Sequence, residues 1–444
     1  MGTMTDSALR PAQDPPDAAH AAHVRYPARA PIVDADGLLR GFELHLRELP
    51  VAAGDEADVR KATDAAAAHL LDALGASDVR TALSGHHGYL NVSRPLLFSD
   101  AIARLAPDRF YLEISPQLTI DSELIARLMT LHARRYRFVI DDVRQPDEGF
   151  AKLLPYAHAI KIDPARFDPE LLQRLAKALK SAGKLMIALN VETHEAFEQA
   201  KTLHFDLFQG YFFARGSKLS TRRVNAPRQA LLNLLRLLSS DPSVAQLEAE
   251  LKLNPVLVMH LMRLANSGEA SIGRKVATLR DAINATGTNR IARWTQLLLY
   301  ADGRKVRLEE DPLVQLAATR ARFMELASTR LAAANRKVVD GAFLTGVFSL
   351  VDAVFGGTLE DTLEALTLAS HIRAAILRRE GQLGTLLGAI EALERGDWEA
   401  LDRASAALAP LTSCELAQIA IAAAAWASTA DQSKENEGLE RIEE

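Results

Sequence analysis

Hydrophobic and polar positions follow two different patterns in the two halves of the chain. Between about residues 26 and 220, short apolar runs alternate with segments of helical periodicity. The runs have the length and the composition of strands, and turn-forming residues separate them. They occur at residues 30–35, 88–93, 110–115, 137–142, 159–164, 185–191 and 205–213. This alternation predicts repeated β–α units and a mainly parallel sheet.

Helical segments lie between these runs, for example at residues 55–76 and 168–183. About seven or eight β–α units in roughly 200 residues favour closure into a compact barrel. The predicted fold of this half is therefore α/β, a TIM-like (β/α) barrel.

The alternation stops near Arg222, and the pattern to about Ser428 is almost wholly helical. The first helical segment carries four leucines on one stripe, Leu231, Leu234, Leu235 and Leu238. The pair Asp241-Pro242 predicts an N-cap followed by proline at the first helical position. We place the boundary at residues 221–227. The predicted organisation is a disordered tail at 1–24, the barrel at 25–222, an all-helical domain at 223–428 and a disordered charged tail at 429–444.

Composition excludes several classes of protein. A net charge of −5, spread along the chain, gives no support to nucleic-acid binding driven by bulk charge. The single cysteine, Cys414, rules out an intrachain disulfide and a thiolate metal cluster. The N-terminus lacks the features of a signal peptide, and the apolar run 416–427 is too short to span a bilayer. We expect a cytoplasmic protein with no membrane insertion and no direct contact with nucleic acid.

Polar residues recur where the predicted strands end, which is where barrels place their functional groups. Oxygen ligands and one lysine in such a ring suit a hard cation and a phosphate ester. Any one of them alone would be explained as a turn former or an N-cap, and only the recurrence favours a site. The residues are Glu43, Asn91, Glu113, Asp141, Asp142, Lys161, Asp163, Glu192 and Gln209.

These residues also resemble, in order and spacing, the motifs of an EAL domain, the cyclic-di-GMP phosphodiesterase barrel. The resemblance covers the first 200 residues. It implies metal ligands at Glu43, Asn91, Glu113 and Asp141. It implies groups around a second metal and the attacked phosphate at Asp142 and Lys161, and dinucleotide contacts at Arg47 and Gln209. The predicted, vestigial cyclic-di-GMP pocket comprises Glu43, Arg47, Asp142, Lys161, Glu192 and Gln209.

The chain departs from the EAL pattern at points that matter for catalysis. Leu189 stands where the family has its proposed general base, and losing such a base typically removes about 10²–10⁴-fold in rate. The loop at 143–146 lacks the family's glycines, Pro116 replaces a bracing glutamate, and Ala30 replaces a ligand-contacting glutamine. The name motif itself reads Glu43-Leu44-His45. We predict a catalytically inactive barrel with no catalytic residue and no required cofactor, whose donors still allow weak Mg²⁺ and weak cyclic-di-GMP binding.

The helical half contains no His-Asp pair, which HD hydrolases need for their metals. The lone His260, on a mostly apolar segment, is interpreted as packed and hydrogen-bonded. The segment from Asp241 through Asn254-Pro255 to Gly287 and Trp294 resembles an HDOD domain, a metal-free relative of the HD superfamily. The resemblance implies that this half binds other signalling proteins.

Three functions remain open. The first is a non-catalytic bacterial signal-transduction or scaffold protein, in which the HDOD domain mediates protein–protein interaction. The second is a functional or weakly active cyclic-di-GMP phosphodiesterase, or an effector that binds this nucleotide. The third, a hydrolase acting through the helical half, is made remote by the missing His-Asp pair. The first is our prediction.

Overall fold

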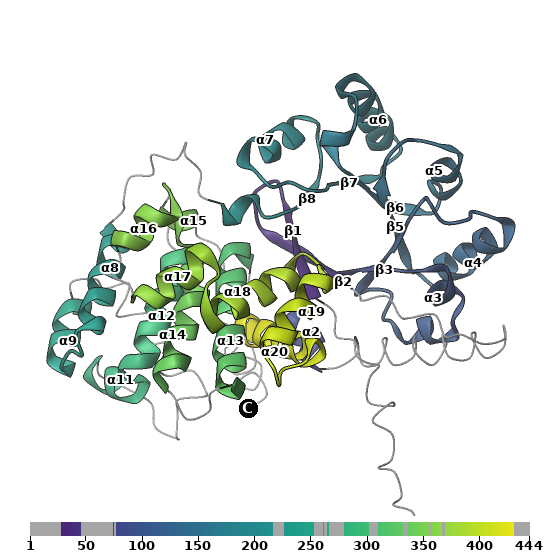
Figure 1. Ribbon diagram of the computed structural model, residues 1–444. Helices are drawn as coiled ribbons and strands as arrows, with labels where there is room; N and C mark the ends of the chain where they lie inside the picture. The colour runs from purple at the N-terminus through teal and green to yellow at the C-terminus, as the bar shows by residue number, and fades with distance from the viewer. Residues whose placement is uncertain are drawn as a thin grey trace, which may run out of the picture.

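The computed structural model has two lobes, a barrel and a group of helices, which lie side by side (Figure 1). The structure describes residues 28–45, 74, 77–215, 226–252, 261, 264–265, 279–301, 310–331, 336–355, 357–365 and 369–429. The predicted helix at 55–76 except Leu74, the predicted tail at 1–24, the predicted tail at 429–444 except Thr429 and most of the predicted boundary at 221–227 lie outside these residues.

The first lobe is a closed eight-stranded barrel with its strands in sequential order. The strands are β1 Ala28–Asp34, β2 Leu39–His45, β3 His87–Asn91, β4 Phe110–Ile114, β5 Arg137–Val143, β6 Ala157–Ile162, β7 Leu185–Ala188 and β8 Leu207–Gln209. The predicted barrel and its mainly parallel sheet are confirmed, with one exception. Strand β1 runs antiparallel to both β2 and β8. The short connection from Asp34 to Leu39 explains this, because a parallel crossover needs a dozen or more residues.

Side chains alternate along each strand between the interior and the surrounding helices. The interior layer is apolar and aromatic, formed by Ile32, Tyr89, Tyr111, Val139, Ala159 and Ile187. Two positions further along the parallel strands, the same interior side carries the predicted polar residues. Side chains two positions apart on a strand point to the same side of the sheet. The polar side chains therefore point into the barrel interior, as the apolar side chains below them do.

Short helices and 3-10 turns surround the barrel, and most have an acidic or hydroxyl N-cap. Asp121 accepts from the backbone of Leu124, and Asp168 accepts from Leu171 in the same way. The elements are α2 Ser77–Ala82, α3 Arg94–Phe98, η2 Asp100–Arg104, α4 Ser122–Ala133, α5 Glu148–Leu153, η3 Pro164–Arg166, α6 Pro169–Ser181, α7 His194–Thr202 and η4 Phe212–Ala214.

The second lobe is helical wherever it is described, as predicted. Its helices are α8 Ala226–Ser239, α9 Val244–Lys252, α11 Leu279–Thr286, α12 Thr288–Ala301, α13 Pro312–Leu331, α14 Arg336–Phe348, α15 Val351–Phe355, α16 Leu359–Ala365, α17 Ser370–Arg378, α18 Gly381–Glu394, α19 Trp398–Ala407 and α20 Ser413–Thr429. The prediction that Asp241-Pro242 begins a helix was wrong by two residues. Helix α9 begins at Val244, because Ser243 and Gln246 form a capping box there.

The lobes are packed together through β1, α2 and the C-terminal helices. Helices α18 and α20 contact β1, and α20 also lies against α2 (Figure 1). The buried side chain of Ile421, on α20, belongs to the barrel's own hydrophobic core. Arg29 of β1 lies over the Phe42 ring at 4.3 Å and donates to the Thr319 hydroxyl of α13 at 2.9 Å. The two lobes therefore share buried contacts across this interface.

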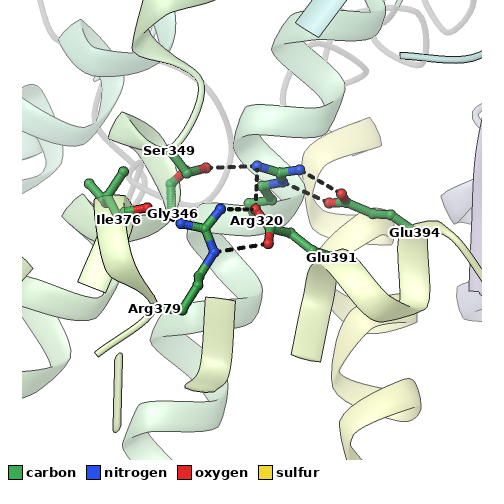
Figure 2. A network of polar contacts seen from close by, with 7 residues as sticks. All are labelled: Arg320, Gly346, Ser349, Ile376, Arg379, Glu391 and Glu394. Carbon is green, nitrogen blue, oxygen red and sulfur yellow. Dashed lines mark hydrogen bonds and ion pairs between the residues drawn. The ribbon is translucent and has the colours of Figure 1, made fainter. Parts of the chain in front are cut away.

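A buried polar network stabilises the helical lobe beside this interface (Figure 2). Arg320 on α13 makes a two-pronged ion pair with Glu394 on α18, with nitrogen–oxygen distances of 2.8 and 2.6 Å. Ser349 accepts a further bond from Arg320, and Arg379 pairs with Glu391 at 2.7 Å. Burial disfavours the Arg320 charge, yet Glu394 outweighs this and raises the pKa of the guanidinium. The network joins α13, α17 and α18 into one body.

Candidate functional site at the mouth of the barrel

The predicted ring assembles at the carboxyl ends of the strands. The upper interior layer consists of Glu43 on β2, Asn91 on β3, Glu113 on β4, Asp141 on β5, Lys161 on β6 and Gln209 on β8. All except Glu43 lie two positions beyond a residue of the lower interior layer, so their inward direction follows from strand alternation.

Lys161 lies at the centre of the ring and is fully buried. Its Nζ is 2.5 Å from Oε2 of Glu43 and 2.5 Å from Oε1 of Glu113. The amide of Gln209 donates to the same Glu43 oxygen at 2.5 Å. Nζ also lies 5.7 Å from the centre of the Tyr89 ring. The ammonium therefore bridges a carboxylate of β2 and a carboxylate of β4, two strands that are separated by β3.

The pKa values of Glu43 and Glu113 are shifted in opposite directions. Burial favours the neutral form of Glu43, but Lys161 and then His45 outweigh it and hold the pKa of Glu43 well below its usual range. Burial and the charge on Glu43 raise the pKa of Glu113 well above its usual range. Burial disfavours the Lys161 charge, yet Glu113 and Glu43 raise the pKa of the ammonium. The Lys161 charge therefore favours ionisation of Glu43, whereas Glu113 releases its proton less readily than an ordinary glutamate.

The two adjacent aspartates occupy different environments. Asp141 accepts from the Asn91 amide at 3.2 Å, and burial raises its pKa. Asp142 adopts a left-handed backbone with φ of 45°, which an aspartate tolerates better than most residues. Its carboxylate pairs with Arg144 at 2.9 Å and with Arg166 at 3.3 Å. Two arginines thus form ion pairs with the carboxylate that the EAL resemblance assigns to a second metal.

The strand end at β7 differs chemically from its neighbours. Leu189 is two residues beyond the inward-facing Ile187, so alternation directs it toward the mouth as well. Every other parallel strand contributes an amide, a carboxylate or an ammonium at this level. The next residue, Asn190, has φ of 56° and donates to Asp163 at 2.9 Å. Opposite Glu43 in the β1–β2 ladder lies Ala30, which offers only a methyl group.

Among the described residues of the predicted pocket, Glu192 does not join the ring. Glu192 lies beyond β7 and pairs with Arg215 at 2.7 Å. Arg47 lies outside the described residues. Asp163 caps the turn at Pro164–Arg166. It therefore has the turn-forming role that the sequence analysis allowed for it.

The donor chemistry of the ring fits a hard divalent cation, since it offers carboxylates and amide oxygens. Both carboxylate oxygens of Glu113 and Oε1 of Gln209 are buried without a hydrogen-bond partner. The close approach of Glu113 Oε1 to Lys161 is an ion pair outside hydrogen-bonding geometry. Among the described residues, no three acidic, histidine or cysteine side chains are grouped as a metal site. A cation here would have to use Asn91 and share the acids with Lys161.

Residues of the helical lobe approach this ring, and sequence reasoning missed them. Tyr211, two positions after Gln209, donates to the backbone carbonyl of Glu394 at 2.9 Å. His45 lies 3.4 Å from Glu43, and a side chain added at Gly396 would approach the His45 ring to 3.1 Å. The partners are separated by well over a hundred residues, so no local motif could reveal them.

Comparison with protein families identifies both lobes. The EAL domain model matches residues 80–216, and the HDOD domain model matches residues 226–375. The chain carries an EAL domain followed by an HDOD domain. Helices α18 to α20, which cover the EAL barrel, lie beyond the matched part of the HDOD domain.

Two curated relatives match most of the chain. The cyclic di-GMP phosphodiesterase CdgJ of Vibrio cholerae is 26% identical over 388 residues, 86% of this chain and 87% of that protein. The uncharacterized protein YuxH of Bacillus subtilis is 24% identical over 378 residues, 84% of this chain and 91% of that protein. Both matches extend over most of this chain, so the similarity to these relatives includes the barrel and the helical lobe.

Solved structures match less of the chain. A complex of Klebsiella pneumoniae BlrP1 with manganese and cyclic di-GMP is 20% identical, with a TM-score of 0.36, and the match covers 43% of this chain and 56% of that one. A standalone EAL protein of Vibrio cholerae bound to cyclic di-GMP is 18% identical, with a TM-score of 0.32, covering 44% of this chain and 92% of that one. Separately, none of the described helices is both long and apolar enough to cross a membrane.

Proposed function

We propose that this chain is a signalling protein whose EAL barrel no longer hydrolyses cyclic-di-GMP at a useful rate and whose HDOD domain binds another regulator. The observation that carries the proposal is Leu189. It follows β7 at the level of the polar ring, where a base would have to take a proton from the attacking water. A leucine side chain has no group that can accept a proton.

The surroundings of Asp142 support the same conclusion. Its two carboxylate oxygens are paired with Arg144 and Arg166, both of which are largely exposed. Two guanidinium groups compensate the charge that a second cation would otherwise compensate. Arg144 and Arg166 can therefore neutralise the Asp142 carboxylate without a second cation.

A second candidate is an active phosphodiesterase, and two observations favour it. The relative CdgJ, 26% identical, is named a cyclic di-GMP phosphodiesterase. The ring also retains Glu43, Asn91, Glu113 and Asp141, the residues that would hold Mg²⁺. A bound Mg²⁺ would polarise a phosphate ester and lower the pKa of a bound water. Within this candidate, Gln209 would orient Glu43 and Lys161 would neutralise charge at the mouth.

The domain interface suggests how a barrel without turnover could still serve a signal. Tyr211 and His45 connect the ring to Glu394 and to the Gly396 turn after α18. Glu394 is also the partner of Arg320 in the buried network. A ligand that moves the ring would therefore bias a packed helical body, with coupling of typically about 1–3 kcal/mol in such systems.

Steady-state hydrolysis tests the proposal. The purified full chain is incubated with cyclic-di-GMP and Mg²⁺ or Mn²⁺, and the products are separated by chromatography. We expect no linear dinucleotide above background. Turnover near ~1 s⁻¹, the low end of typical enzymes, would contradict the proposal. The variant Glu43→Gln controls for contamination, because only activity intrinsic to this barrel would fall with it.

A further inference from the structure

The opposite end of the barrel carries a cavity of about 560 Å³ that the site above does not use. It lies where β5, β6 and β7 begin, at the floor of the barrel. Its volume falls within the range of small-molecule pockets, about 300–1,000 Å³.

Positive charge dominates the lining of this cavity. Two arginines and a lysine contribute fixed cations, two histidines contribute imidazoles, and Asp108 contributes one carboxylate. The basic residues are His132, Arg135, Arg137, His158 and Lys184. A concave surface of one sign focuses the field and concentrates ions of the opposite sign.

Two of the cations are held in place. Arg137 donates to the Tyr111 hydroxyl at 2.9 Å and lies 5.7 Å from the centre of that ring. Lys184 donates to the Ala157 carbonyl at 2.6 Å. A guanidinium has five N–H donors and an ammonium has three, so most of their donors remain for a ligand. Ordering two cations in advance reduces the entropy lost on binding.

The positive charges at this cavity lower the pKa of two nearby histidines. Burial lowers the pKa of His158, and the positive charges of Arg137 and Lys184 lower it further. His87, stacked edge-on against Tyr111 at 4.9 Å, has a lowered pKa through burial and Arg137. Within the described part of the chain, Asp108 forms no ion pair with these cations. Asp108 supplies the one carboxylate among the described lining residues, so positive charge exceeds negative charge in the cavity.

We propose that this floor cavity, defined by Arg135, Arg137, His158 and Lys184, binds a small phosphate-bearing anion. The planar donors of arginine match phosphate oxygens, and a flexible lysine adds a point charge. The stacked rings of His158, Tyr111 and Tyr89 link this floor with Lys161 at the mouth. The inference is independent of whether the mouth of the barrel hydrolyses cyclic-di-GMP.

Calorimetric titration of the full chain with inorganic pyrophosphate, at constant ionic strength set with chloride, tests this site. We expect saturable binding of one anion per chain. The double variant Arg137→Gln, Lys184→Gln should bind about 10²-fold more weakly, since two charge-assisted hydrogen bonds are lost. The matched control is Arg174→Gln, Lys177→Gln, which removes the same charge from the exposed face of α6 and should bind as the wild type does.

Arg135→Gln provides a second variant, because this exposed side chain lacks a polar partner in the described structure and its loss should leave folding intact. We expect about threefold to tenfold weaker binding from losing one such cation. Absence of saturable binding, or equal weakening by the α6 control, would overturn the proposal.

Discussion

At the residue scale, Lys161 decides the electrostatics of the barrel mouth. It is fully buried, and its ammonium pairs with Glu43 and with Glu113, whose pKa is raised. Removing one partner of such a pair leaves an uncompensated buried charge, which costs far more than the pair contributes.

Lys161→Met should therefore destabilise the fold strongly, by about 3–5 kcal/mol. Chemical denaturation of the purified variant measures the change. Lys152→Met is the control, because Lys152 makes an exposed pair with Glu148 and its loss should cost less than about 1 kcal/mol. Equal stability of the two variants would contradict the burial of the Lys161 charge.

Glu113→Gln should change the pH dependence of stability. Native Glu113 loses its proton at a higher pH than the unfolded chain, in which glutamate titrates near about pH 4.3, because burial and Glu43 raise its native pKa. The native state then binds more protons, so stability falls as pH rises from that point toward the raised native pKa. Glutamine removes this contribution. Melting temperatures between pH 5 and 7 should fall less for the variant, and parallel curves would refute the assignment.

Leu189→Glu alone should not produce robust hydrolysis. Asp142 would remain paired with Arg144 and Arg166, and groups that act as a unit are strongly non-additive. The hydrolysis assay above measures this. Turnover approaching ~1 s⁻¹ in the single variant would show that the altered loop is tolerated.

At the element scale, strands were predictable and their long-range partners were not. Alternation in "YLNVS", "YLEIS" and "RFVIDD" specifies the inward positions Asn91, Glu113 and Asp141, because strand period is two. The antiparallel direction of β1 was missed, since the sequence pattern carries no strand direction. The start of α9 was misplaced because the Ser243–Gln246 capping box outweighs the Asp241-Pro242 pair.

A substitution in the turn after α18 tests the contact between the HDOD-containing lobe and the ring. Gly396 has φ of 66° and faces the ring of His45, which lies beside Glu43. Gly396→Ala should therefore perturb the His45 ring and destabilise the chain. Gly381→Ala is a matched control, because Gly381 has φ of 67° but no neighbour where its added carbon would lie.

Both variants should lose about 1 kcal/mol from backbone strain. Only Gly396→Ala should also shift the side-chain NMR signals of His45. Identical His45 signals in both variants would show that this turn does not reach the ring.

At the scale of the whole molecule, the sequence anticipated two packed domains but could not indicate the surface that joins them. That surface combines Ile421 and Ala424 of α20 with β1 and α2, far apart in the chain. Small apolar residues such as Ala424 complete a helix–helix contact here, and the same composition would suit the interior of an isolated helical domain.

Ala424→Glu should separate the cooperative unfolding of the two lobes. Ala424 is buried against Ala82 of α2, and an unpaired carboxylate there costs several kcal/mol. Calorimetry should show one main transition for the wild type and two for the variant. Ala422→Glu, at a partly exposed position on the same helix, should behave as the wild type does. Two transitions in the wild type would mean that the lobes are merely strung together.

We propose that the EAL barrel of this chain lacks the proton-transfer group for hydrolysis, because Leu189 follows β7 at the level of the polar ring. A single-turnover experiment tests it most directly, with protein in excess over cyclic-di-GMP and Mn²⁺ present, so that weak binding and slow product release do not limit the outcome. We expect the nucleotide to be recovered intact over many minutes. Conversion to linear dinucleotide within seconds, abolished by Glu43→Gln, would contradict it.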